Sequence, residues 1–218
     1  MVMRRYFDEQ IAHLNEQMIA MGGMVENIIE TACAALDNND LRKAAAIRDG
    51  DGAVDHKERE VESLCLHMLL QQQPVARDLR VISAALKMIT DMERIGDQAA
   101  DISEIVTMAH LTHERPGHFT TMARAAIDMV HRAVEAYVRQ DVMLARQVMA
   151  SDDIVDDLFN DVKADVAELL HKDPSGIEEA LDLLMIAKYL ERIGDHAVNI
   201  AEWVVYAITG LYKGEVLR

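Results

Sequence analysis

The chain has 218 residues, of which half are hydrophobic but only 4% aromatic, and its 38 acidic residues outnumber 22 basic ones, giving a formal net charge of −16. This charge repels nucleic-acid phosphates and anionic lipid headgroups, so direct nucleic-acid binding is not expected. No run approaches the ~18 apolar residues of a membrane span, and the N-terminus turns acidic at Asp8, so we expect neither membrane insertion nor a signal peptide. The isolated Cys33 and Cys65 fit free thiols in a reducing compartment, which favours a cytoplasmic location.

Helical periodicity predicts three long helices in the first half of the chain. The first covers residues 6–37, where apolar residues recur at three- and four-residue steps. The segment 38–40 then forms a turn that offers an N-cap residue. The second helix continues to about Gln72 and is loosened near the glycines of 49–52. Pro74 separates it from a third helix, expected over residues 76–111.

The second half repeats this plan. We expect helices over residues 118–138, 141–171 and 176–210, with an irregularity of the middle helix near Ser151. Pro116 lies between the halves in the segment 113–118. The predicted fold is therefore all-α, a tandem repeat of two three-helix antiparallel bundles with six long helices, divided into units 1–113 and 114–218.

One motif occurs twice without change. Glu-Arg-Ile-Gly-Asp stands at 93–97 and again at 191–195, inside a longer match of 93–106 to 191–204. A glycine within a helix costs about 1 kcal/mol relative to alanine. Its recurrence as Gly96 and Gly194 indicates that a neighbouring helix or a ligand approaches closely there.

Acidic side chains recur at four-residue steps around these glycines, and residues four apart lie on one face of a helix. A further acidic pair occurs in each half on the preceding helix, which neighbours the motif helix in a three-helix bundle. Stacked like charges are unfavourable, and a bound cation removes that cost. The candidate metal ligands are Asp51, Asp55, Glu93, Asp97 and Asp101 in the first half, and Asp152, Asp156, Glu191, Asp195 and Asn199 in the second.

Oxygen-rich sites of this kind suit hard cations such as Mg²⁺, Ca²⁺ or Mn²⁺, and also iron in carboxylate-bridged clusters. Zinc is compatible but usually takes some His or Cys ligands. Two alternatives to a structural metal site stay open. In the first, the acids form a solvated face balanced by Arg94 and Arg192. In the second, the chain is a metal-dependent redox or hydrolytic enzyme that uses the same carboxylates. A ferritin-like di-iron oxidase needs two Glu-x-x-His motifs, and this chain offers only Glu168-x-x-His171.

The repeated Glu-Arg-Ile-Gly-Asp motifs resemble those of the PhoU family of bacterial phosphate regulators. The likeness covers nearly the whole chain, including the turn 73–80 and the segment 190–202. It implies two tandem three-helix bundles whose Glu/Asp-x-x-x-Asp motifs bind multinuclear clusters of iron or zinc. Asn199 stands where the first repeat has Asp101, so the resemblance implies a second site with less negative charge.

The resemblance also implies partners. Proteins of this family look like adaptors between the ATPase subunit of the phosphate ABC transporter and the sensor histidine kinase of the phosphate regulon. They restrain the phosphate-starvation response and modulate phosphate uptake, and homodimers are common among them. We therefore expect a non-enzymatic, metal-binding negative regulator.

Overall fold

The computed structural model describes residues 2–50, 52–72, 74, 77–109 and 117–216. Its helices fall into two sets of matching lengths and order, as the repeat predicted. The first set is α1 (Val2–Asn38), α2 (Leu41–Asp49), α3 (Gly52–Gln72) and α4 (Arg77–Met108). The second is α5 (Gly117–Arg139), α6 (Val142–Ala150), α7 (Asp152–Lys172) and α8 (Ile177–Thr209), with a 3₁₀ turn (Pro174–Gly176) before α8.

The middle helix of each bundle is divided more sharply than the sequence indicated. The expected helices over 41–72 and 141–171 are each two helices, broken at Gly50 and at Ser151. At both breaks a backbone N–H bonds three residues back, from Gly50 to Ile47 and from Ser151 to Val148, which closes the short helix before the next begins. The positions of the two breaks match the predicted irregularities.

The turns that follow α1 and α5 are built alike. Asn39 (φ 50°) and Gln140 (φ 52°) both adopt the left-handed conformation that ends a helix. Asp40 and Asp141 then cap α2 and α6, and the carboxylate of Asp40 accepts a hydrogen bond of 3.1 Å from the backbone N–H of Lys43. The predicted turn and N-cap at 38–40 are therefore confirmed.

A small antiparallel hairpin follows α8, and the sequence pattern did not predict it. Strand β1 (Leu211–Tyr212) pairs with β2 (Glu215–Val216). The turn residues Lys213 (φ 50°) and Gly214 (φ 83°) are both left-handed, which suits a two-residue hairpin turn. Tyr212 stacks on Trp203 of α8 with ring centroids 4.2 Å apart, so the hairpin is held against the helix.

The first helix is more apolar than the sequence analysis allowed. The segment Phe7–Asn38 has a window of mean hydropathy 1.3, long and apolar enough to cross a membrane by length and composition alone. Nearly half of that window (44%) is buried inside the bundle, and Leu14, Met18 and Val25 are fully buried in the core. A core helix of a helical bundle passes the same test of length and composition, and one face of α1 is packed in this way.

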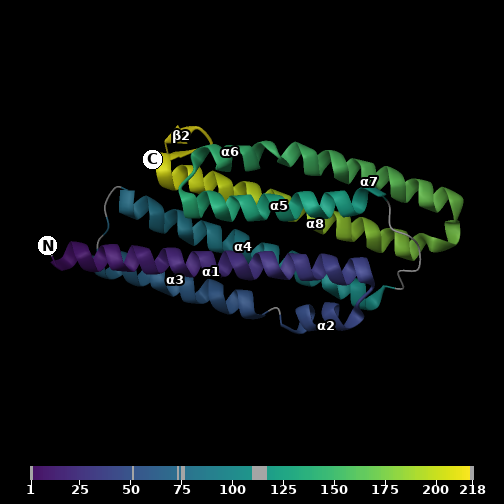
Figure 1. The fold of residues 1–218 in the computed structure, drawn as a ribbon, viewed down its shortest axis with the longest axis horizontal. Helices are drawn as coiled ribbons and strands as arrows, with labels where there is room; N and C mark the ends of the chain where they lie inside the picture. Colours follow the sequence, from purple (N-terminus) through teal and green to yellow (C-terminus); the bar gives the residue numbers. More distant parts are fainter. Residues whose placement is uncertain (1, 51, 73, 75–76, 110–116, 217–218) are drawn as a thin grey trace.

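The two bundles lie side by side along their length (Figure 1). Their most extensive contact is between α4 and α8, and α1 also packs on α5. Polar bonds join α1 to α5 at two places: the Tyr137 hydroxyl donates to Asn15 Oδ1 at 2.6 Å, and His131 Nδ1 lies 2.9 Å from Glu26 Oε2. The expected boundary between units, at residue 113, falls outside the described residues.

Candidate metal centre

The repeated glycines bring a neighbouring helix close to the motif helix. A Cβ atom at Gly96 would lie 3.3 Å from Cγ1 of Val54, and one at Gly194 would lie 3.5 Å from Cγ1 of Val155. Each valine, fully buried, thus packs directly on a helix surface that has no side chain in the way. The close approach predicted from the glycines is therefore one of a neighbouring helix, α3 on α4 and α7 on α8.

This packing places an acidic residue of α3 beside the acids of α4. Asp55 follows Val54 in sequence, and its carboxylate converges with those of Glu93 and Asp97. One oxygen from each of the three lies within 4.8 Å of the others. Oxygen ligands of a single cation at bond lengths of 2.0–2.6 Å are at most about 5 Å apart. The three side chains therefore fit a hard cation with little rearrangement.

The site is partly shielded and strongly negative. The side chains of Asp55, Glu93 and Asp97 are 36%, 18% and 29% exposed. Burial raises the pKa of Glu93 above its usual range, and the charge of Asp97 raises it further, while Arg94 opposes the rise. The Arg94 guanidinium donates to Asp97 Oδ2 at 3.0 Å and lies 3.5 Å from Glu93 Oε2. A second exposed arginine, Arg59, lies 3.4 Å from Asp55 Oδ2. A crowded group of carboxylates with exposed arginines at its edge is an electrostatic setting that a bound cation relieves.

The second repeat gathers its acids on the corresponding surface of α7 and α8. Burial, with the charges of Asp195 and Asp156, raises the pKa of Asp152 to about 6. Burial and then Glu191 likewise raise the pKa of Asp195. The four acids of the second repeat therefore interact electrostatically. Within the part of the chain that the structure describes, however, only the first-repeat trio converges to ligand spacing. Asp51, predicted as a partner of Asp55, lies outside the described residues.

The candidate ligands at four-residue steps form two predicted ladders, 93–97–101 on α4 and 191–195–199 on α8, and the last member of each lies away from the converging carboxylates. The amide of Asn199 donates from Nδ2 to Asp91 Oδ1 at 3.0 Å, between α8 and α4. Asp101 is hydrogen-bonded to Tyr189 across the same interface, and burial raises its pKa while that bond lowers it. These two side chains bind the opposite repeat and are not part of the converging carboxylate group.

Three further residues at the sites were not picked out from the sequence. Glu58 lies one turn beyond Asp55 and adds its charge to the surroundings of Glu93. In the second repeat Lys188, one turn before Glu191, is hydrogen-bonded to that glutamate at 2.5 Å. The spacing of three residues from a candidate ligand was the available signal in both cases. Phe159, beside Lys188, carried no signal of its own.

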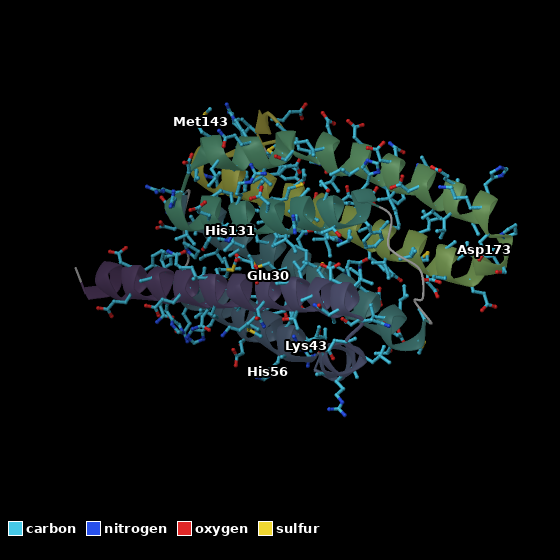
Figure 2. All side chains as sticks on the ribbon, turned by 45° about the vertical axis from the view of Figure 1, so that its right-hand side comes forward. Glu30, Lys43, His56, His131, Met143 and Asp173 are labelled. Carbon is cyan, nitrogen blue, oxygen red and sulfur yellow. The ribbon has the colours of Figure 1, made fainter. Side chains whose placement is uncertain are left out.

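The histidines next to the motifs are engaged in other contacts. His56, labelled at the lower edge of the molecule in Figure 2, is largely exposed. Its Nε2 lies 3.3 Å from Glu60 Oε1. His196 donates from Nδ1 to Asp91 Oδ1 at 2.9 Å. At the isolated Glu-x-x-His motif, the Glu168 carboxylate pairs with Lys172 at 2.6 Å on an exposed stretch of α7. None of these contacts resembles a di-iron arrangement.

The fold and the acidic clusters define a two-repeat helical-bundle protein with a converging carboxylate trio in the first repeat and a second acidic cluster at the corresponding surface of the other. The family model described as the PhoU domain matches residues 18–106 and again residues 119–204. The chain therefore belongs to the PhoU family.

Relatives of similar length support this family assignment. The chain is 31% identical over 210 residues to the "Phosphate-specific transport system accessory protein PhoU homolog" of Clostridium acetobutylicum, covering 95% of this chain and 96% of that one. It is 33% identical over 215 residues to the protein of the same name from Aquifex aeolicus, covering 96% and 94%. These names describe accessory proteins of the phosphate-specific transport system.

Solved structures show the same fold. The crystal structure of PhoU from Pseudomonas aeruginosa superposes with a TM-score of 0.88 at 32% identity, covering 94% of this chain and all of that one. The phosphate transport system regulatory protein PhoU from Streptococcus pneumoniae superposes at 0.89 with 25% identity, covering 94% and 98%. The predicted tandem of three-helix bundles is thereby confirmed.

Proposed function

We propose that the protein is a non-enzymatic cytoplasmic adaptor that modulates phosphate uptake and restrains the phosphate-starvation response. Its partners are the ATPase subunit of the phosphate ABC transporter and the sensor histidine kinase of the phosphate regulon, and it works as a homodimer. The main support is the family match in both repeats, together with full-length relatives named for the phosphate-specific transport system. The alternative of a metal-dependent enzyme draws no support from these relatives.

We further propose that each repeat holds a metal ion through its paired acids. Asp55, Glu93 and Asp97 supply the oxygens in the first repeat, with Asp51 as a further ligand, and Asp152, Asp156, Glu191 and Asp195 do so in the second. Asp101 and Asn199 are left out because their side chains are engaged between α4 and α8. Iron, zinc and manganese are the favoured ions, and magnesium or calcium fits the same oxygens.

The carboxylates have a structural task in this proposal. When bound, the cation supplies positive charge that offsets the repulsion between acids on α3 and α4. The side chains of Asp55, Glu93 and Asp97 then tie the two helices together on the outer face of the bundle. This keeps an acidic, rigid face presented to basic surfaces of a partner.

The direct test is genetic. Deleting the gene should raise expression of a phosphate-starvation reporter in phosphate-rich medium, and a plasmid copy of the wild type should restore repression. The same strain carrying Asp55→Asn with Asp97→Asn separates the metal proposal from the adaptor proposal. Unchanged reporter expression in the deletion strain would contradict the adaptor proposal.

A further inference from the structure

Among the differences between the two carboxylate clusters is a pair of facing positions, one on the motif helix and one on its neighbour. Aligning 93–97 with 191–195 places Thr90 of the first repeat opposite Lys188 of the second. Aligning the valines that pack on Gly96 and Gly194 places Glu58 opposite Phe159. An acid and a neutral residue in the first repeat thus correspond to a neutral residue and a base in the second.

In the first repeat the pair adds negative charge to the site. The Thr90 hydroxyl donates to Glu58 Oε1 at 3.3 Å across α4 and α3, which keeps the Glu58 carboxylate near the cluster. The charge of Glu58 acts on Glu93, as does that of Asp55. The first site is therefore richer by one carboxylate than the trio that converges.

In the second repeat the same place holds a positive charge. Lys188 is hydrogen-bonded to Glu191, and its Nζ also lies 5.4 Å from the centroid of the Phe159 ring. Its charge acts on Asp195 as well. The aromatic ring on the facing helix favours the ammonium group there, so Lys188 is held over the cluster by two groups.

The arginine of the Glu-Arg-Ile-Gly-Asp motif is not a source of the charge difference between the two repeats. Arg94 and Arg192 occupy the same position in both repeats. Arg94 is more than half exposed and reaches its carboxylates from within its own helix. The first repeat has a further base of its own, Arg59, whose Nη2 lies 3.4 Å from Asp55 Oδ2, but Arg59 is 69% exposed and reaches Asp55 from within its own helix. Lys188 stands where the first repeat has Thr90, and it also lies against the Phe159 ring of the facing helix.

We propose that Lys188 is a built-in counter-cation that lowers the metal affinity of the second repeat, so that the two repeats bind cations unequally. This inference depends on the proposed metal binding and adds the rank order of the two sites. A divalent ion at the second site must either displace Lys188 from Glu191 or bind beside its charge. Repulsion by one charge at roughly 5 Å in a water-like dielectric lowers affinity about tenfold.

The test is a titration of metal-free protein with Mn²⁺, in which electron paramagnetic resonance measures the free ion. Wild type should show a tight and a weak class of site. Asp97→Asn should remove the tight class, and Asp195→Asn the weak one. Lys188→Thr, which installs the first-repeat residue, should tighten the weak class about tenfold. Lys188→Arg keeps the charge and should leave the class weak.

The reciprocal change provides a matched control. Thr90→Lys should weaken the tight class about tenfold without altering the second repeat. A tight class that persists while Lys188→Thr leaves the weak class unchanged would overturn the role of Lys188 and spare the metal proposal. Loss of the tight class in Asp195→Asn would reverse the rank order and also overturn it. Absence of Mn²⁺ binding in every folded variant, checked by circular dichroism, would overturn both proposals.

Discussion

Asn199 and Asp91 are hydrogen-bonded between the two repeats, with Nδ2 donating to Oδ1 at 3.0 Å. The repeat alignment pairs Asn199 with Asp101, and Asp91 with Tyr189. Asp101 and Tyr189 are themselves hydrogen-bonded, so the same two positions meet twice across α4 and α8. The third position of each predicted ladder is thereby assigned to the interface, because the pseudo-symmetric crossing of α4 and α8 brings it opposite a polar partner.

Changing Asn199 to aspartate should destabilise the protein. Asn199→Asp would place two carboxylates at hydrogen-bond distance in a part-buried position, and we expect a loss of about 1–3 kcal/mol. Urea unfolding followed by circular dichroism measures this loss. The exchange Asp91→Asn with Asn199→Asp restores one amide and one acid and should recover much of the stability. If the single variant instead keeps its stability and gains a metal ion, Asn199 belongs to the ladder after all.

Two adjacent glycines of α1 should respond in opposite ways to alanine. A Cβ at Gly22 would lie 2.7 Å from Cγ1 of Val134 on α5, whereas a Cβ at Gly23 meets nothing within 4 Å. Gly22→Ala should therefore cost about 1–3 kcal/mol by overpacking the contact between repeats. Gly23→Ala should add about 0.5–1 kcal/mol through helix propensity. Thermal unfolding of the two variants side by side checks both signs, and equal shifts would contradict the α1–α5 packing.

The contact of His131 with Glu26 should make the α1–α5 interface sensitive to pH. The hydrogen bond that His131 donates to Glu26 raises the pKa of His131 above its ordinary value. His131 is labelled in Figure 2 on α5, and its side chain is 59% exposed, so the effect on stability is below about 1 kcal/mol.

The sign follows from the raised pKa. The stabilisation is fully present below the ordinary pKa of His131 and is lost as pH rises through the raised one. Nuclear magnetic resonance should give a His131 pKa that falls towards the ordinary value in Glu26→Gln. The stability difference between wild type and His131→Gln should shrink between pH 6 and pH 9. An ordinary His131 pKa in wild type would show that the bond does not form in solution.

The structural features that could be predicted from the sequence are those that depend on residues close together in the chain. The cap at Asp40 involves the backbone N–H of Lys43, three residues away, so residue type and spacing were sufficient to predict it. The close approach at Gly96 was also predictable, because an unfavourable helix residue repeated in place needs a packing reason. Which side chain fills that space, Val54, required the fold.

The remaining features depend on contacts between distant segments. Asn199 matches a ladder position by spacing, and only the crossing of α4 and α8 shows that it meets Asp91 instead. The terminal hairpin depends on two left-handed residues, Lys213 and Gly214, and on stacking of Tyr212 against the helix. Strands of two residues are too short to show an alternating hydrophobic pattern, so the sequence periodicity did not predict this hairpin.

Metal content per chain, measured by mass spectrometry on tag-free protein purified without chelator, tests most directly whether the repeated carboxylates are ligands. We expect bound metal in the wild type and its loss in Asp97→Asn with Asp195→Asn, with the helical circular dichroism unchanged. The control Glu104→Gln with Asp157→Asn changes two exposed acids of α4 and α7 and should keep the metal. Full metal retention in the first variant, or a folded wild type without metal, would contradict the assignment of these carboxylates as ligands.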